Sequence, residues 1–545
     1  MTRRLLLIVL PIAIVGCSHA PPQTASVVQQ AMPFDPGYAI SAADLRRDLF
    51  IFAADSFRGR ETGTPDAQRA AAFLAKRAQQ LGLEPAGDSL YVQRVPLARL
   101  VFTHATRLAV MTSSGREQPL RLGVDVAPVI SVDEAFPEPK RNAEGEVIFV
   151  GYGPTDDVES EALARFDLAG KVLVAIHGAP ARVRREQIRS LESQRVLSER
   201  LARLIALRPA AIVLLMSGSA EQLYEQFAPR LLRTVVLDRP GERLEEPAAD
   251  SARSTPAILM GVARRGSPLL PTGWPNDAAP QALGRQLSVH LEVERQPFTG
   301  YNVAAVLRGS DPRLNKTYLG YGAHYDHLGI ISPRRTGGRR ARPDSIANGA
   351  NDDGSGSVAL LAIARQMSYL RPRRSVLFVW HIGEEKGLLG SSYFTAHPTV
   401  PIDSIVTEFN ADAIAGNDEN TLSLVGPRAA PNYLSWRVGM IVDSVNSAAL
   451  TPLKIDRRWD DPEDPDVAFE HGDHYNYVKK AIPTIFFSTG WNADYHTVSD
   501  EPQKIEYDKL ARVAELMLES GFAVANRSTR PTSEAVTQSI SSRQP

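Results

Sequence analysis

The stretch TYLGYGAH, from Thr317 to His324, is a short apolar run that ends in an imidazole. Similar runs lie on both sides of it along the chain: NVAAVL, SVLFVWHIGEE, SIVTEFNAD and IPTIFFSTG. Helical segments separate them, such as Ser355–Leu370, whose apolar residues recur on one face. Short apolar strands that alternate with helices predict a layered α/β fold with a largely parallel sheet.

Ionisable side chains follow these strands at the point where each strand ends. Because parallel strands bring their carboxyl ends to one edge of a sheet, ligands bind at that edge. The residues concerned are His324, Asp326, Asp352, Asp353, Glu384, Glu385, Asp412 and His496. Two imidazoles and several carboxylates without a thiolate suit Zn²⁺ or a similar cation. The sequence therefore predicts a metal site at this edge.

Asp352 and Asp353 stand side by side in a Gly-rich turn, NGANDDGSGS, which runs from Asn348 to Ser357. Neighbouring carboxylates raise each other's pKa unless a cation is present. A carboxylate can bridge two metal ions about 3.5–4 Å apart. We therefore predict that Asp352 lies between two ions and that Asp353 orients neighbouring groups. The alternative interpretation is a solvated Asp-Gly turn.

Five stretches resemble, in order, the motifs of the co-catalytic di-zinc aminopeptidase family: GAHYDHLG, NDDGSGS, GEEKGLLGS, NAD and DYHTVSDEP. DSFRGRETGTP, from Asp55 to Pro65, resembles the N-terminal stretch of the same family. The family includes leucine aminopeptidases and glutamate carboxypeptidases. The resemblance implies a three-layer α/β peptidase domain with a mixed, largely parallel sheet, and two Zn²⁺ ions as cofactors.

The resemblance also implies a role for each candidate residue. One zinc ion would be bound by His324 and Asp412 and the other by Glu385 and His496, with Asp352 as the bridge. Glu384 would be the general base, and Asp326 would orient the first histidine. His474 or Tyr475, in the stretch HGDHYNY, would contact the substrate or the oxyanion. The sequence alone does not distinguish which of the two adjacent glutamates is the base.

The implied activity is that of a zinc-dependent exopeptidase that removes N-terminal residues from peptides with a metal-activated water. One alternative is a carboxypeptidase of the same family, in which the arginines at positions 334, 335, 339, 340 and 342 could bind a substrate carboxylate. A second is a single-zinc acyltransferase similar to glutaminyl cyclase. A third is a binding protein of the same architecture, as in the transferrin receptor. The presence of both His324 and Asp412 favours two metal ions.

Residues 121–270 have a different pattern, with β-rich runs bounded by Gly and Pro, such as GEVIFVGYG, GKVLVAIHGAP and AAIVLLM. VGYG and AGKVLV resemble the protease-associated domain, a β-rich insert of several peptidase families. We predict such an insert at 121–270, which divides the peptidase domain into residues 39–120 and 271–525. We predict a structural role for His177, the insert's one histidine.

The N-terminus is typical of an exported lipoprotein. Arg3 and Arg4 precede an apolar run that ends in IVGC, and Cys17, the only cysteine, resembles the acylated residue of the bacterial lipobox. We predict a lipoprotein signal peptide at 1–17 and a tether at 18–38. Membrane attachment would occur through lipidated Cys17, and the protein would be an outer-membrane lipoprotein of the bacterial cell envelope.

The composition and the C-terminus add two further expectations. The net charge is −1, from 61 Lys and Arg and 62 Asp and Glu, so a nucleic-acid partner is not expected. Peptide substrates are the expected partners, and the oligomeric state is unknown. The polar residues 526–545 are predicted to form a disordered tail.

Overall fold

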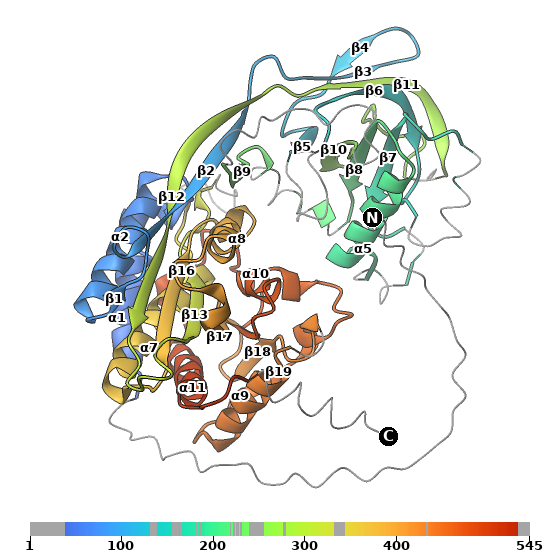
Figure 1. Ribbon diagram of the computed structural model, residues 1–545. Coiled ribbons are helices and arrows are strands. Elements are labelled where there is room, and N and C mark those ends of the chain that lie inside the picture. The colour runs from blue at the N-terminus through green and yellow to red at the C-terminus, as the bar shows by residue number, and fades with distance from the viewer. Residues whose placement is uncertain are drawn as a thin grey trace, which may run out of the picture. The chain divides into compact units, whose positions relative to one another are not determined.

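The computed structural model describes residues 39–531 (Figure 1). Gaps in this range fall at 131–138, 155–162, 164–165, 181–182, 185–187, 189, 219, 222–223, 225–227, 229–230, 239–254, 276–278, 332–343 and 432–433. The predicted signal peptide and tether, with Cys17, lie outside the described residues. So do most of the predicted C-terminal tail and the arginines between positions 334 and 342.

The larger sheet has ten strands, in the order β19-β18-β20-β17-β13-β16-β12-β2-β9, with β1 paired to β12. Their bounds are β1 (Glu84–Pro85), β2 (Val92–Phe102), β9 (Val235–Leu237), β12 (Val293–Leu307), β13 (Tyr318–His324), β16 (Ser375–His381), β17 (Ile405–Ala411), β18 (Thr421–Val425), β19 (Lys454–Asp456) and β20 (Thr484–Ser488). Four neighbouring central strands, β16, β13, β17 and β20, are parallel. Their carboxyl ends therefore share one edge, and the predicted mixed α/β fold is confirmed.

Helices cover both faces of this sheet. On one face, the Tyr321 hydroxyl of β13 donates a 2.8 Å hydrogen bond to the Met517 carbonyl of α11 (Tyr507–Ala525). On the same face, the Trp380 indole of β16 donates to the Ser357 carbonyl of α7 (Gly356–Leu370). The opposite face of β16 packs with Phe394 of α8 (Leu389–Ala396) and Tyr477 of α10 (His474–Val478) in one apolar cluster. The result is three layers, as predicted.

Local signals set the ends of the first helices. α1 (Ala42–Phe52) begins after Ser41, whose side chain accepts a hydrogen bond from the Asp44 amide. α2 (Pro65–Gln80) begins after Thr64, which caps it in the same way, and Pro65 takes the first helical position. Gly82 follows the end of α2 with a positive φ of 75°, a conformation that favours glycine. Both helix starts and this stop follow from the sequence. The remaining long helix of this domain is α9 (Trp436–Ala448).

A second sheet has eight strands, in the order β4-β3-β11-β6-β7-β8-β10-β5. Their bounds are β3 (Arg107–Met111), β4 (Glu117–Pro119), β5 (Val126–Val129), β6 (Asn142–Phe149), β7 (Val172–His177), β8 (Ala211–Met216), β10 (Ala257–Val262) and β11 (Gln281–His290). Each of its faces carries a buried apolar cluster, and α5 (Gln194–Ala206) packs on one of them. A two-stranded sheet joins β14 (Gly329–Ile330) to β15 (Ile346–Ala347).

The eight-stranded sheet extends beyond the predicted insert, because β3 precedes residue 121 and β11 follows residue 270. In addition, β9 lies within the predicted insert but pairs with β2 of the larger sheet. The domain limits and the protease-associated assignment therefore stay predictions.

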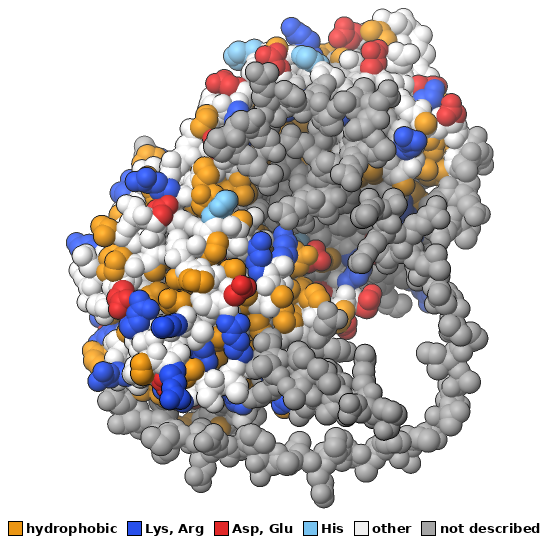
Figure 2. Space-filling view, in the orientation of Figure 1, with side chains coloured by type: hydrophobic (Ala, Val, Ile, Leu, Met, Phe, Trp, Pro, Cys, Tyr) orange, Lys and Arg blue, Asp and Glu red, His pale blue; other side chains and the backbone are white. Residues whose placement is uncertain are grey.

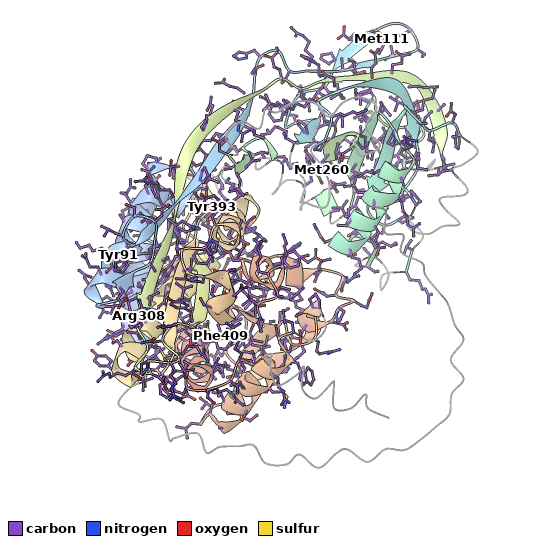
Figure 3. The ribbon with its side chains drawn as sticks, in the orientation of Figure 1. Tyr91, Met111, Met260, Arg308, Tyr393 and Phe409 are labelled. Carbon is purple, nitrogen blue, oxygen red and sulfur yellow. The ribbon has the colours of Figure 1, made fainter. Side chains whose placement is uncertain are left out.

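Side-chain burial distinguishes the interior of the sheets from their edges (Figure 3). Phe409, on the central strand β17 of the larger sheet, is fully buried. Met111, the last residue of β3 in the smaller sheet, is 40% exposed. On the face shown in Figure 2, basic, acidic and apolar side chains are interspersed over the described residues, in keeping with the net charge of −1.

Candidate metal centre

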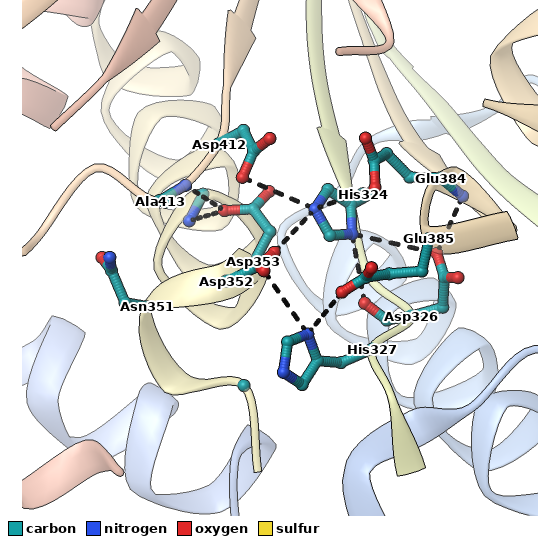
Figure 4. Close-up of polar contacts among 12 residues, drawn as sticks. His324, Asp326, His327, Asn351, Asp352, Asp353, Glu384, Glu385, Asp412 and Ala413 are labelled. Carbon is teal, nitrogen blue, oxygen red and sulfur yellow. Dashed lines mark hydrogen bonds and ion pairs between the residues drawn. The ribbon is translucent and has the colours of Figure 1, made fainter. Parts of the chain in front are cut away.

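The four parallel central strands deliver ionisable side chains to one edge of the larger sheet. His324 is the last residue of β13, and Asp412 directly follows β17. Glu384 and Glu385 begin a short turn, η4 (Glu384–Lys386), after β16. Asp352 and Asp353 lie in the turn η3 (Ala350–Ser355) before α7, and the peptide bond between them is cis. Figure 4 shows these side chains pointing toward one another.

His324 is the centre of a first group of ligand atoms. Its Nε2 lies 3.1 Å from Asp352 Oδ1, 3.5 Å from Asp412 Oδ1 and 3.9 Å from Glu384 Oε2. The ring is almost fully buried, at 1% exposure. An imidazole and three carboxylates therefore surround one point inside the protein.

A second group lies on the other side of Asp352. His496 Nε2 is 3.0 Å from Asp352 Oδ2 and 3.3 Å from Glu385 Oε2. His327 Nδ1 is 2.7 Å from Glu385 Oε1 and 3.7 Å from Asp352 Oδ2. The two oxygens of Asp352 thus face different groups.

Hydrogen bonds from surrounding residues hold these side chains in place. Asp326 Oδ2 accepts from the Thr62 hydroxyl, and Asp326 Oδ1 accepts from the amides of Gly383 and Glu384, so this carboxylate fixes the turn that carries both glutamates. Asp353 Oδ1 accepts from the amides of Gly356 and Ala413. Asp326 was predicted to orient His324, but its carboxylate Oδ1 lies 3.8 Å from His324 Nδ1, and that nitrogen faces the Asp326 backbone carbonyl at 3.1 Å. The orienting roles of Asp326 and Asp353 stay predictions.

The cluster concentrates negative charge in the interior. Burial raises the pKa of Glu384 and Asp353 well above the usual carboxyl range, and the nearby Asp412 carboxylate adds to both shifts. Burial opposes a charged His324, yet the carboxylates of Glu384, Asp352 and Asp412 raise its pKa well above the usual value. Cations at this place would relieve the repulsion.

The side chains fit two zinc ions on chemical and geometric grounds. Imidazole nitrogens and carboxylate oxygens are both zinc ligands. Bonds of about 2.0–2.1 Å in tetrahedral geometry place two ligands of one ion about 3.3 Å apart. The distances of 3.0, 3.1, 3.3 and 3.5 Å within the two groups match this spacing.

Three residues near the site were not singled out from the sequence. His327 lies in the second group, and it falls within the quoted stretch GAHYDHLG, which could have indicated it. Asp500 accepts from the amides of Asn351 and Asp352 and so holds the central turn. Arg60 is fully buried and donates to the carbonyls of Tyr325, Asn348 and Gly349, which ties two site loops together. Arg60 and Asp500 fall within the quoted stretches DSFRGRETGTP and DYHTVSDEP, which could have indicated them.

The predicted substrate contacts, His474 and Tyr475, pack with aromatic side chains. His474 is fully buried and stacks on Phe486 with ring centroids 4.4 Å apart. Tyr475 is half-buried and packs edge-on against Phe469. Their roles as substrate or oxyanion contacts stay predictions. Burial is the main cause of the raised pKa of Glu384, and the carboxylate of Asp473, the residue before His474, adds to it.

The fold and the site together define a class of protein, the zinc peptidases with an α/β sheet and a two-part ligand cluster at its carboxyl edge. Residues 302–521 match the model described as Peptidase family M28. The resemblance to zinc aminopeptidases that the motifs indicated is therefore confirmed.

Relatives with known names agree with this assignment. The chain is 24% identical over 294 residues to a probable leucine aminopeptidase of Trichophyton verrucosum, which covers 51% of this chain and 74% of that protein. It is 38% identical over 197 residues to aminopeptidase Y of Saccharomyces cerevisiae, covering 33% of this chain and 34% of that protein. The chain thus spans about a third of aminopeptidase Y. It covers 64% of a second probable leucine aminopeptidase, from Arthroderma benhamiae.

A solved structure supports the fold. The aminopeptidase from Aneurinibacillus sp. strain AM-1 superposes with a TM-score of 0.55 at 18% identity, covering 90% of this chain and 95% of that one. At this identity the likeness concerns the fold alone.

The predicted localisation, an outer-membrane lipoprotein of the bacterial cell envelope, is wrong. Curated relatives of the chain are fungal aminopeptidases and vacuolar membrane proteases, the latter from Lachancea thermotolerans and Vanderwaltozyma polyspora. The prediction rested on the N-terminal pattern around Cys17, and those residues lie outside the described part of the chain. Among the described residues, no helix is long and apolar enough to cross a membrane.

Proposed function

We propose that the chain is a zinc-dependent exopeptidase that removes N-terminal residues from peptides. The observation that carries the proposal is the placement of Asp352. Its Oδ1 lies 3.1 Å from His324 Nε2, and its Oδ2 lies 3.0 Å from His496 Nε2. One carboxylate that faces two imidazoles on opposite sides is suited to bridge two metal ions.

Each group of side chains would hold one zinc ion. His324 and Asp412 would bind the first and Glu385 and His496 the second, with Asp352 shared between them. When bound, the two ions would lower the pKa of a water molecule and polarise the scissile carbonyl. Asp326 contributes by holding the turn of Glu384 through two backbone amides, at 2.9 and 3.2 Å.

Glu384 is the proposed general base. Its side chain is 14% exposed, in contrast to 2% for Glu385, and its Oε2 is 3.9 Å from His324 Nε2. It therefore borders the first group while keeping access to an incoming substrate. A Glu384 oxygen would accept the proton of the attacking water and then deliver it to the leaving amine.

The preference for the amino end of a peptide is supported by the names of the relatives, leucine aminopeptidase and aminopeptidase Y. A free-amino aminoacyl amide should be cleaved, and its N-acetylated form should be spared. A comparison of the two substrates, with and without a zinc chelator, tests the proposal. Equal turnover of both substrates would overturn the preference for the amino end, and release from the carboxyl end alone would assign the chain to the carboxypeptidase alternative.

Zinc content separates the remaining alternatives. About two zinc ions per chain are expected when a shared carboxylate bridges two positions. One ion per chain together with cyclisation of an N-terminal glutamine would favour the acyltransferase. Absence of both zinc and turnover would favour a binding protein.

A further inference from the structure

His327 lies at the metal centre but has no role in the proposed reaction. It follows β13 by three residues, in the loop that begins with His324 and Asp326. Its side chain is 0% exposed. A fully buried imidazole needs partners, because burial of an unsatisfied polar group costs free energy.

The ring of His327 faces the second group of ligand atoms. Its Nδ1 lies 2.7 Å from Glu385 Oε1 and 3.7 Å from Asp352 Oδ2 (Figure 4). The centroid of its ring is 5.8 Å from that of His496. Two imidazoles therefore converge on the same two carboxylates.

The contact with Glu385 is not a well-formed hydrogen bond. Within the described part of the chain, neither ring nitrogen of His327 has a hydrogen-bond partner of acceptable geometry. Two ligand atoms of one tetrahedral zinc ion lie about 3.3 Å apart. The 2.7 and 3.7 Å distances from His327 Nδ1 to Glu385 Oε1 and Asp352 Oδ2 lie on either side of this spacing.

The backbone holds His327 in this position. Its amide donates to the Arg60 carbonyl, and the Arg60 side chain in turn binds the loop of Asn348 and Gly349. The ring packs against Gly349, where a Cβ would lie 2.5 Å from the His327 Cγ. Gly349 has a φ of 59°, so glycine satisfies both the conformation and the close approach. These contacts fix the position of the imidazole.

We propose that His327 is a direct ligand of the second metal position, which then has four side-chain ligands: His327, Asp352, Glu385 and His496. The proposal rests on the zinc centre described under Proposed function. Zinc with four protein ligands is closed, whereas zinc with three keeps a place for water. The first position, with His324, Asp352 and Asp412, would keep that place, and Glu384 borders this position. The two positions would therefore differ in role and in affinity.

X-ray absorption of the zinc-loaded wild-type protein tests the proposal directly. If His327 binds zinc, three imidazoles are shared between two ions, and the spectrum should show a histidine contribution about one and a half times that of a centre with two. This measurement does not depend on activity or on the folding of a variant. Zinc content of the same sample tests the proposed function separately, because a protein without zinc would refute the centre itself.

Metal affinity of His327→Gln provides the second test, by competition with a graded series of chelators. Loss of an outer-shell partner costs about 10–100-fold in metal affinity, so loss of a direct ligand should cost more than about 100-fold for one of the two ions. The matched control is His381→Gln. His381 is equally buried and ends the neighbouring strand β16, but its Nε2 faces the Tyr477 hydroxyl at 3.1 Å. The control should keep both zinc affinities near the wild-type values.

The outcomes separate the two roles that His327 can have. A wild-type histidine contribution of three that falls to two in His327→Gln supports a ligand. A contribution of two in both proteins, even with a weaker affinity, means that His327 only positions Glu385 and overturns the proposal. If His327→Gln does not fold, the wild-type spectrum alone decides.

Discussion

Glu384 and Glu385 are adjacent in sequence but lie in different surroundings. Glu385 is 2% exposed and reaches His496 and His327 with its two oxygens. Glu384 is 14% exposed and borders His324 at 3.9 Å. Asp326 accepts hydrogen bonds from the amides of Gly383 and Glu384 and so fixes the backbone of the turn η4. The fixed turn holds the two glutamate side chains in these different surroundings. A ligand role and a base role therefore fit different members of the pair.

Substitution of each glutamate by glutamine should separate chemistry from metal binding. Glu384→Gln keeps the volume and removes the base, so it should fold and hold about two zinc ions while kcat falls by ~10²–10⁴-fold. The loss should appear in kcat more than in KM, because the proton transfer belongs to the transition state. Steady-state kinetics and elemental analysis provide the measurements.

Glu385→Gln is the matched control for that experiment, since it makes the same chemical change one residue away. It should lower the zinc content as well as the rate. Equal loss of metal in the two variants, or full activity of Glu384→Gln, would contradict the assigned roles.

The sequence predicted the residues that directly follow strands, because strand ends can be placed from apolar runs. His324, Glu385 and Asp412 were found in this way, and the structure brings them together. His327 was not found, because its direction depends on Gly349, which is distant in sequence and packs against the ring. Asp500 was missed for a similar reason, since its partners are backbone amides of a different loop. The sequence does not encode such contacts at any regular spacing.

At the scale of elements, periodic segments were predicted best. The helix expected at Ser355–Leu370 is α7 (Gly356–Leu370), because its apolar face is continuous. α5 begins at Gln194, after Ser193 accepts a hydrogen bond from the Val196 amide as its N-cap. A cap inside a polar segment is harder to recognise than an apolar stripe.

Helix α11 approaches β13 so closely that only glycine fits at one position. A Cβ at Gly521 would lie 1.8 Å from the Tyr321 hydroxyl oxygen and 3.0 Å from Leu319 Cδ2. In an unconstrained helix, Gly→Ala is worth roughly 0.5–1 kcal/mol of stabilisation. Overpacking of a core typically costs about 1–3 kcal/mol. We therefore expect Gly521→Ala to lower the unfolding free energy, and a urea unfolding curve measures it.

Tyr321→Phe provides the control for this contact. It removes the hydroxyl and also the hydrogen bond to the Met517 carbonyl, so alone it should destabilise the protein by about 0.5–1.5 kcal/mol. In the variant that carries both Gly521→Ala and Tyr321→Phe, the two losses of unfolding free energy should be less than additive. The reason is that the hydroxyl oxygen that blocks the new methyl group is gone. Additive losses would show that Gly521 is required for another reason.

At the scale of the whole molecule, two sheets lie within one chain, and the chain passes between them four times. It leaves the larger sheet after β2 for β3, returns to it from β8 for the short strand β9, leaves it again for β10, and returns finally from β11 to β12. The sequence indicated two patterns, one of strands alternating with helices and one rich in strands, but it placed the limits of the strand-rich part at residues 121 and 270. The β-rich pattern does not distinguish strands of one sheet from those of the next, because both alternate in the same way. Pairing partners decide the boundary, and these are not visible in one sequence.

The smaller sheet contains a buried histidine that should make its stability depend on pH. His177 ends β7, is 0% exposed, and lies with Nδ1 2.9 Å from the Arg200 guanidinium. Burial, together with the charge of Arg200, lowers the pKa of His177 to about 4. The guanidinium can only donate, so Nδ1 accepts and the ring is neutral. The structure is consistent with the predicted structural role.

The direction of the pH effect follows from the two pKa values. The unfolded chain protonates this residue near pH 6.5, and the folded protein does so only near pH 4. Between these values the unfolded state binds more protons, so the unfolding free energy should fall as pH decreases from 6.5 to 4, by about 3 kcal/mol.

His177→Gln, which keeps an acceptor for Arg200 but does not titrate, should lack this component. Urea midpoints of both proteins across pH 4–7 give the difference, and subtraction removes the contribution of the carboxylates at the metal centre. His104→Gln, a change at an exposed histidine, should retain the wild-type profile. Parallel profiles for wild type and His177→Gln would show that His177 is not held neutral by the fold.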